Sequence, residues 1–215
     1  MATLDVAQFG AATRGGSENA QGLLLLDSSG ALVVIDLFAK LIQDGLGYQV
    51  RAGTVTTPLV GDVVITDTAA EYAVTAAAGK VVVPVYQCIS INLGGGTLHE
   101  YATKSVTGAH SGTAFVPLPL DTGGAACAST AAVAAAGAVT VTAELATTTR
   151  RHWSSDNPVA IGTGFSNTSM VWEPLRPPRI TGGFCLYTQI AATSTGPSYY
   201  ANLDFLELAA AQIGY

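Results

Sequence analysis

The stretch VVVPVYQCISINL, residues 81–93, carries no charged residue and is rich in Val and Ile. These β-branched side chains favour extended backbone, so the stretch predicts a strand. Side chains alternate between the two faces of a strand, so one face is expected to hold Val83, Val85, Gln87, Ile89 and Ile91. Pro84 cannot donate a hydrogen bond to a neighbouring strand and therefore predicts a sheet edge or a bulge.

Similar extended segments lie on both sides of this strand. Gly, Pro, Asp and Ser residues separate them, as turn-forming residues do. The pattern predicts further strands or extended segments at 48–56, 62–66, 71–75, 97–106, 113–120, 138–146, 183–192 and 198–208. Short strands at this spacing are typical of a β-sandwich or a β-barrel, and we find no internal repeat.

Helical periodicity is confined to one segment. Residues 35–46 place Leu37, Phe38, Leu41 and Ile42 at helical spacing, with Asp36 as a cap and Gly45 as a stop signal. We expect a helix of two or three turns here. The Ala-rich residues 125–136 fit either a short helix or a segment packed through small side chains.

Two regions fall outside the regular pattern. Residues 1–22 are small and polar and predict a flexible N-terminal arm. Residues 23–26 and 31–37 then predict a hairpin, which begins a single domain of residues 23–215. Residues 150–182 contain several prolines and no periodicity, so we expect a long ordered loop with short β pieces at most.

The chain has few charges. Charged residues make up 11% of its 215 residues, and the net charge is −6. Disordered chains and solvated long helices need many more charged residues, and binding to a nucleic-acid backbone needs a basic face. A surface poor in charge but rich in Ala, Thr, Ser and Gly indicates burial against other subunits.

Catalytic and metal-binding motifs are not found. The cysteines 88, 127 and 185 form no CxxC pair, and His99, His110 and His152 show no ligand spacing. There is no nucleophile elbow, no phosphate loop and no paired carboxylate motif. We therefore expect a protein that is not an enzyme and that has no cofactor and no metal.

The sequence also bears on membrane insertion and targeting. Residues 122–143 are uncharged and long enough to span a bilayer, but they consist of Ala, Thr and Gly rather than Leu, Ile and Phe. The N-terminal residues MATLDVAQFG lack the features of a secretory signal. We expect no membrane span and assembly in a cytoplasm.

One group of aromatic and basic residues could form a contact site. It comprises Trp153, Trp172, Tyr199, Tyr200, Arg150 and Arg151. Three interpretations remain open for the aromatic residues: a stacking platform for sugars, an anchor between subunits, and ordinary core filling. Trp, Tyr and Arg dominate the energetics of protein interfaces, which favours Arg150 and Arg151 as contacts for a partner.

Residues 172–208, WEPLRPPRITGGFCLYTQIAATSTGPSYYANLDFLEL, combine a Pro-containing lead-in, a Gly turn, a strand, an Ala/Thr/Ser turn and a closing aromatic strand that ends in Glu. This layout resembles the closing hairpin of phage and viral β-sandwich virion proteins, including single jelly-roll capsid proteins. The resemblance implies an all-β, jelly-roll-like antiparallel sandwich with at most one or two short helices.

The same resemblance implies a structural subunit of a capsid, decoration or tail that self-assembles in the virion. Its partners would be copies of itself and other virion proteins, with no catalytic residues. Residues 1–22 depart from RNA-packaging arms because Arg14 is their only basic residue, so we expect no direct nucleic-acid binding. The alternative is a surface or tail module that binds a carbohydrate or a receptor.

Overall fold

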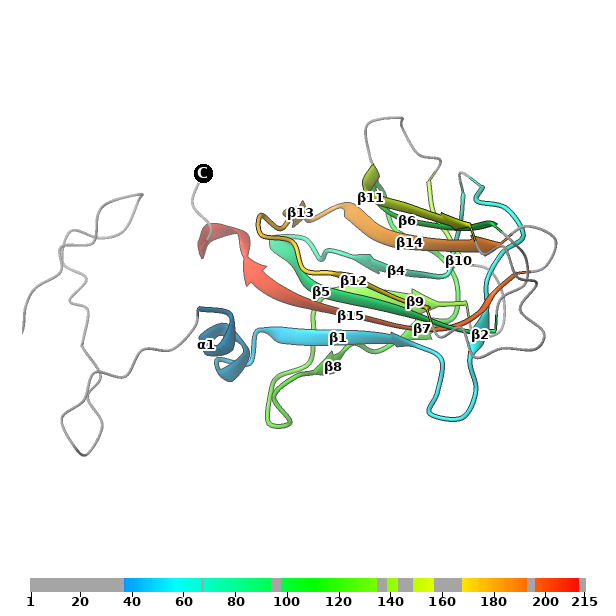
Figure 1. The fold of residues 1–215 in the computed structure, drawn as a ribbon. Coiled ribbons are helices and arrows are strands. Elements are labelled where there is room, and N and C mark those ends of the chain that lie inside the picture. Colours follow the sequence, from blue (N-terminus) through cyan, green and yellow to red (C-terminus); the bar gives the residue numbers. More distant parts are fainter. Residues whose placement is uncertain are drawn as a thin grey trace, which may run out of the picture.

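A computed structural model describes residues 37–66, 68–93, 98–134, 139–142, 149–156, 168–192 and 196–212. Two large antiparallel sheets lie face to face, and a short helix, α1, lies beside one end of them (Figure 1). The predicted arm (1–22) and the predicted hairpin up to residue 36 lie outside the described residues.

The first sheet is built around the last strand of the chain. Its order is β12 (Thr168–Trp172), β5 (Lys80–Leu93), β15 (Ser198–Ala209), β1 (Gly47–Ala52) and β8 (Leu118–Pro119). Two short strands join it, because β2 (Leu59–Val60) pairs with β15 and β13 (Ile180–Thr181) pairs with β5.

The second sheet is centred on the preceding long strand. Its order is β11 (Thr149–Asp156), β6 (Leu98–Thr107), β14 (Phe184–Ala192), β4 (Tyr72–Thr75), β9 (Thr130–Val133) and β7 (Ala114–Phe115). A small additional pair, β3 (Ala69–Ala70) with β10 (Val139–Thr140), packs small apolar residues on the outer side of this sheet.

The order of strands defines a jelly roll. Strands β1, β5, β12 and β15 belong to the first sheet, whereas β4, β6, β11 and β14 belong to the second. Among these eight strands, the chain crosses from one sheet to the other at β1–β4, β4–β5, β5–β6, β11–β12, β12–β14 and β14–β15. This double-sheet wrapping is the jelly-roll arrangement, so the predicted all-β sandwich is confirmed.

The predicted closing hairpin is wrong. Strand β14 pairs with β4 and β6, whereas β15 pairs with β1 and β5. Both strands are central in their sheets and bury many side chains. A hairpin would place them next to each other in one sheet, but the connection between them instead crosses the sandwich.

A bulge in β5 changes which of its residues face the core. Tyr86 pairs with Asp204 and Pro84 pairs with Phe205, so Val85 is the additional residue. Ile89 faces the core beyond the bulge, and Val82 faces it before the bulge. The prediction of one continuous face was therefore wrong, whereas the prediction of a bulge at Pro84 is confirmed.

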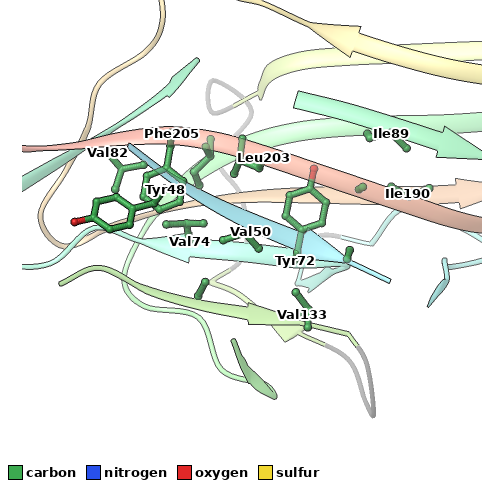
Figure 2. Packing of buried hydrophobic residues seen from close by; sticks show 14 of the residues in the cluster. Tyr48, Val50, Tyr72, Val74, Val82, Ile89, Val133, Ile190, Leu203 and Phe205 are labelled. Atoms are coloured by element: carbon green, nitrogen blue, oxygen red, sulfur yellow. The ribbon is translucent and has the colours of Figure 1, made fainter. Parts of the chain in front are cut away.

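Aliphatic and aromatic side chains from both sheets fill the space between them (Figure 2). The labelled residues are Tyr48, Val50, Tyr72, Val74, Val82, Ile89, Val133, Ile190, Leu203 and Phe205. The rings of Tyr48 and Phe205 lie 5.9 Å apart between centroids. Each sheet thus has one face buried in a shared core.

The predicted helix is confirmed as α1, which spans Leu37–Gln43. Two residues after the helix ends at Gln43, Gly45 has a φ of 75°, the left-handed conformation that glycine adopts most easily. Leu41 and Ile42 pack on the outer side of the first sheet, against Val81, Val83 and Leu206. The helix therefore covers one end of that sheet face.

Three other expectations change in the structure. Residues 62–66 form no strand, apart from a single bridge at Asp62. Within the predicted loop at 150–182, β12 and β13 are short β pieces of the kind expected, whereas β11 is an eight-residue strand that was not predicted. The part of 125–136 that is described contains β9 and no helix, with Ala131 and Ala132 buried, which supports the alternative of small-residue packing.

A polar cluster lies within the apolar core. Gln87 Nε2 donates to Tyr72 Oη at 2.5 Å and to Thr188 Oγ1 at 2.8 Å, and Thr103 Oγ1 donates to Gln87 Oε1 at 2.9 Å. Gln87 comes from the first sheet and its three partners from the second. These hydrogen bonds therefore fix the lateral position of one sheet on the other, because each buried polar atom needs its partner.

We expect Gln87→Leu to lower the free energy of unfolding by about 2–4 kcal/mol, since it removes three buried hydrogen bonds and leaves only the 3.1 Å contact between the Thr103 and Thr188 hydroxyls to replace them. Urea unfolding measures this change. Gln49→Leu is the matched control, because Gln49 is half-buried on the outer face and bonds only Asp204 among the described contacts. Equal losses in the two variants would contradict a special role for the buried cluster.

Candidate functional site

The six residues predicted as a contact site lie on three strands, and the structure describes the side chains of only three of them. Three of them, Trp153, Arg150 and Arg151, lie on β11 at the edge of the second sheet, and their side chains are outside the described part. Trp172 is half-buried at the end of β12, an edge strand of the first sheet. Tyr199 and Tyr200 are neighbours on β15 and point to opposite faces of that sheet.

Tyr199 is a core residue. Its side chain is fully buried and packs between the sheets, so core filling is the correct interpretation and a binding role is wrong for this residue. Its hydroxyl donates a hydrogen bond of 3.0 Å to Glu71 Oε2. Through this hydrogen bond Tyr199 contacts Glu71, an acidic residue that the sequence pattern did not single out.

Glu71 is a buried carboxyl at one end of the sandwich. Its side chain is 3% exposed, and its Oε1 accepts a hydrogen bond of 3.1 Å from the backbone N–H of Asp62. Burial and, to a smaller extent, the charge of Asp62 raise the pKa of Glu71. Hydrogen bonds from Tyr199 and the Asp62 backbone lower it, and the net result is a pKa of about 8. Glu71 therefore holds its proton in the folded protein at neutral pH.

The segment 53–66, which contacts Glu71 through the backbone of Asp62, exposes apolar side chains that we call the valine patch. It consists of Val55, Val60, Val63 and Val64, which are 92%, 66%, 53% and 60% exposed. These residues lie on the connection from β1 to β4 at one end of the sandwich (Figure 1). Asp62 is the single charged residue in 53–66, so this segment is apolar and poor in charge.

A second buried carboxyl, Glu207, lies at the other end of β15. It accepts hydrogen bonds from the backbone N–H groups of Ala128 at 3.0 Å and Ser129 at 2.6 Å, and from the Cys127 thiol at 3.3 Å. Burial opposes its ionisation, but these donors hold the pKa of Glu207 below its usual value. Its stabilising effect is present near neutral pH and is lost as pH falls through that lowered pKa.

A half-open cavity of about 400 Å³ adjoins Glu207. The end of α1 and the loop 121–128 form its walls, and Asp44, Asp121 and Lys80 bring charge to the lining. The Lys80 ammonium lies 3.9 Å from Glu207 Oε1. The small Gly and Ala residues of the loop leave this space open, and the lining is acidic overall.

The outer face of the first sheet is exposed in addition to the valine patch and the cavity beside Glu207. Tyr200, Asn202 and Asp204 of β15 alternate with its core residues, and each is half-buried. Paired strands place Arg51 beside Asn202 and Tyr86 beside Asp204. This face therefore combines tyrosine rings with amide, carboxylate and guanidinium groups.

The remaining titratable groups have structural contacts. His110 Nδ1 lies 2.7 Å from Thr75 Oγ1, and burial lowers the pKa of this histidine. Within the described ranges, no three His, Cys, Asp or Glu side chains are grouped to hold a metal ion. Nor does any helix of the described part have the length and apolar character needed to cross a membrane.

Comparison with known proteins gives no family assignment: no protein-family model and no curated protein matches this chain.

We expect Glu207→Gln to increase the rate of Cys127 alkylation by about tenfold or more. Burial and the Glu207 charge raise the pKa of Cys127 to about 12, and the thiolate is the reactive form. Peptide mass spectrometry after iodoacetamide treatment measures the rate. Cys185, which is buried away from Glu207 with a pKa raised by burial to about 11, is the internal control. An unchanged rate at Cys127 would contradict the role assigned to Glu207.

Proposed function

We propose that this protein is a structural virion subunit, of a capsid, a decoration or a tail, that acts by self-assembly. It would assemble with copies of itself and with other virion proteins into a symmetric oligomer or shell, in the host cytoplasm and then in the virion. The proposal assigns it no catalytic step.

The valine patch is the observation that carries this proposal. Isolated exposed apolar residues are ordinary, but several at one end of a molecule that has few charges indicate a contact surface. Leu175 is also completely exposed, and Val116 is 72% exposed. Because only 11% of its residues are charged, the chain has little charge repulsion to keep the apolar surfaces of two molecules apart in solution.

The fold adds support of a more general kind. Jelly rolls occur in viral capsid proteins, in lectins and in cupins, so the topology is compatible with the proposal without selecting it. Here the space between the sheets is filled by the apolar core and the Gln87 cluster. Because the space between the sheets is filled, a partner would contact the outer faces and the ends of the sandwich.

Substitution within the valine patch tests the proposal. We expect the wild-type chain to give a molar mass far above 21.8 kDa by light scattering, and Val63→Asp to reduce the assembled fraction by tenfold or more. The reason is that a charge placed in an apolar contact must be desolvated. Val171→Asp is the matched control, because Val171 is 50% exposed on the edge strand β12, compared with 53% for Val63.

Unchanged urea unfolding of the Val63→Asp monomer would show that only assembly is affected. A wild-type chain that remains at 21.8 kDa at every concentration would contradict self-assembly as its function.

The outer face of the first sheet favours a second candidate, a carbohydrate-binding surface or tail module. Tyrosine rings beside amide and carboxylate groups suit sugars, which need an apolar platform and hydrogen-bonding partners. Tyr200, rather than the buried Tyr199, is the residue on this face. Tyr200→Ala should then abolish binding on a glycan array while assembly persists, and an array without any bound glycan would remove this candidate.

A further inference from the structure

Residues 59–62 are hydrogen-bonded to both sheets. On the first sheet, β2 pairs with the start of β15 through Val60–Ser198 and Leu59–Tyr199. On the second sheet, the Asp62 N–H donates to Ile190 O at 2.9 Å, and Ala192 N–H donates to Asp62 O at 3.0 Å. This short segment therefore joins the two layers at one end of the sandwich.

The fit of this segment leaves no space for a partly shifted position. A Cβ atom on Gly61 would lie 2.5 Å from Ile190 O, and one on Gly196 would lie 1.6 Å from Gly61 O. Gly61 N–H also donates to Pro197 O at 2.8 Å. Because the backbones touch, the segment is either seated with these hydrogen bonds or separated from them.

Glu71 lies beneath the segment and contacts it directly. Its Oε1 accepts the Asp62 N–H, and its Oε2 accepts the Tyr199 hydroxyl, so it links the segment to β15. The titratable groups that face it are Asp62 on the segment, Tyr199 on β15 and Tyr72 on β4. In the described part of the chain, no Lys, Arg or His forms an ion pair with Glu71.

We propose that residues 59–64 are a pH-operated clasp, which is seated while Glu71 carries its proton and released when Glu71 and Asp62 are both charged. Ionisation puts a second negative charge on a buried group beside Asp62, with no cation bonded to it. Separation of the segment exposes Glu71 to water and increases its distance from Asp62. The clasp carries Val60, Val63 and Val64, so the same event moves most of the valine patch.

The direction of the pH effect follows from the two states of Glu71. In the seated clasp, burial and Asp62 raise the pKa of Glu71 to about 8, whereas exposure would return it toward the ordinary value of about 4.3. The seated form therefore holds the proton more tightly, and its advantage is complete below the lower pKa. The opening constant should rise about tenfold per pH unit between these values and level off above pH 8.

Hydrogen exchange of the full chain tests the clasp directly. Amide exchange of peptides covering residues 59–66 is measured from pH 6 to 9 and corrected for the intrinsic rise of exchange with pH. Peptides from the centre of β15 report global unfolding in the same samples. Glu71→Gln keeps an acceptor for the Asp62 N–H and cannot ionise, and Asp204→Asn removes a half-buried carboxylate that bonds Gln49, away from the clasp.

We expect protection of residues 59–66 in the wild type to fall at least tenfold between pH 6 and pH 8, with little change in β15. Glu71→Gln should be independent of pH, and Asp204→Asn should match the wild type. If Glu71→Gln does not fold, Asp62→Asn supplies the test. Removing the neighbouring charge lowers the pKa of Glu71 in the seated clasp, so the loss of protection should level off at lower pH and be smaller in total than in the wild type.

Three results would overturn the proposal. The first is protection of residues 59–66 that is independent of pH in the wild type. The second is the same pH dependence in Glu71→Gln or an unshifted transition in Asp62→Asn. The third is a loss of protection in β15 that parallels the loss at 59–66, which would assign the titration to global unfolding. The exchange is measured at a concentration at which light scattering gives the monomer mass of 21.8 kDa, because assembly through the valine patch would itself protect residues 59–66.

Discussion

The insertion of the last strand, β15, between β1 and β5 is the constraint on which the rest of the structure depends. Its inward side chains continue from one end of the sandwich to the other: Tyr199 bonds Glu71 at the clasp, Leu203 and Phe205 fill the core, and Glu207 holds the backbone at 128–129. The first sheet is complete only when this strand is in place. Because its partners β1 and β5 lie far away in the sequence, the fold depends on long-range pairing that forms slowly and cooperatively.

The two ends of β15 also show how the surroundings of a buried carboxyl group decide its protonation, because burial raises the pKa of both Glu71 and Glu207. Glu71 and Glu207 are both 3% exposed. Glu207 accepts hydrogen bonds from two backbone N–H groups and a thiol, with Lys80 nearby, so its charged form is favoured. For Glu71, burial and the neighbouring Asp62 carboxylate outweigh its two hydrogen bonds, so its neutral form is favoured. The proposed pH response therefore belongs to the Glu71 end of the sandwich and not to the Glu207 end.

The sequence predicted strands well where one face is continuously apolar, as in β14 and β15, and it predicted the helix α1 from the spacing of its apolar residues. It did not predict which strands pair, because two neighbouring strands can form a hairpin or cross between sheets with the same pattern. Pro84 indicated a sheet edge or a bulge, but only the pairing with β15 shows that a bulge forms and that Val85 is the additional residue. Alternation separated Tyr199 from Tyr200, but only the packed sheets show which of them is buried. Glu71 had no signal in the sequence, since Tyr199, its partner, lies far along the chain and Asp62 contacts it through the backbone.

The filled interior, the low charge and the exposed valine patch are the features on which the proposed role as an assembling subunit depends. Electron microscopy of the purified chain is the most direct test, because images distinguish ordered assembly from unspecific association. Our account predicts closed rings or particles of one size, with rotational symmetry in the class averages. A field without particles, or clumps without a repeating unit, would contradict the assignment as a structural subunit that assembles by itself.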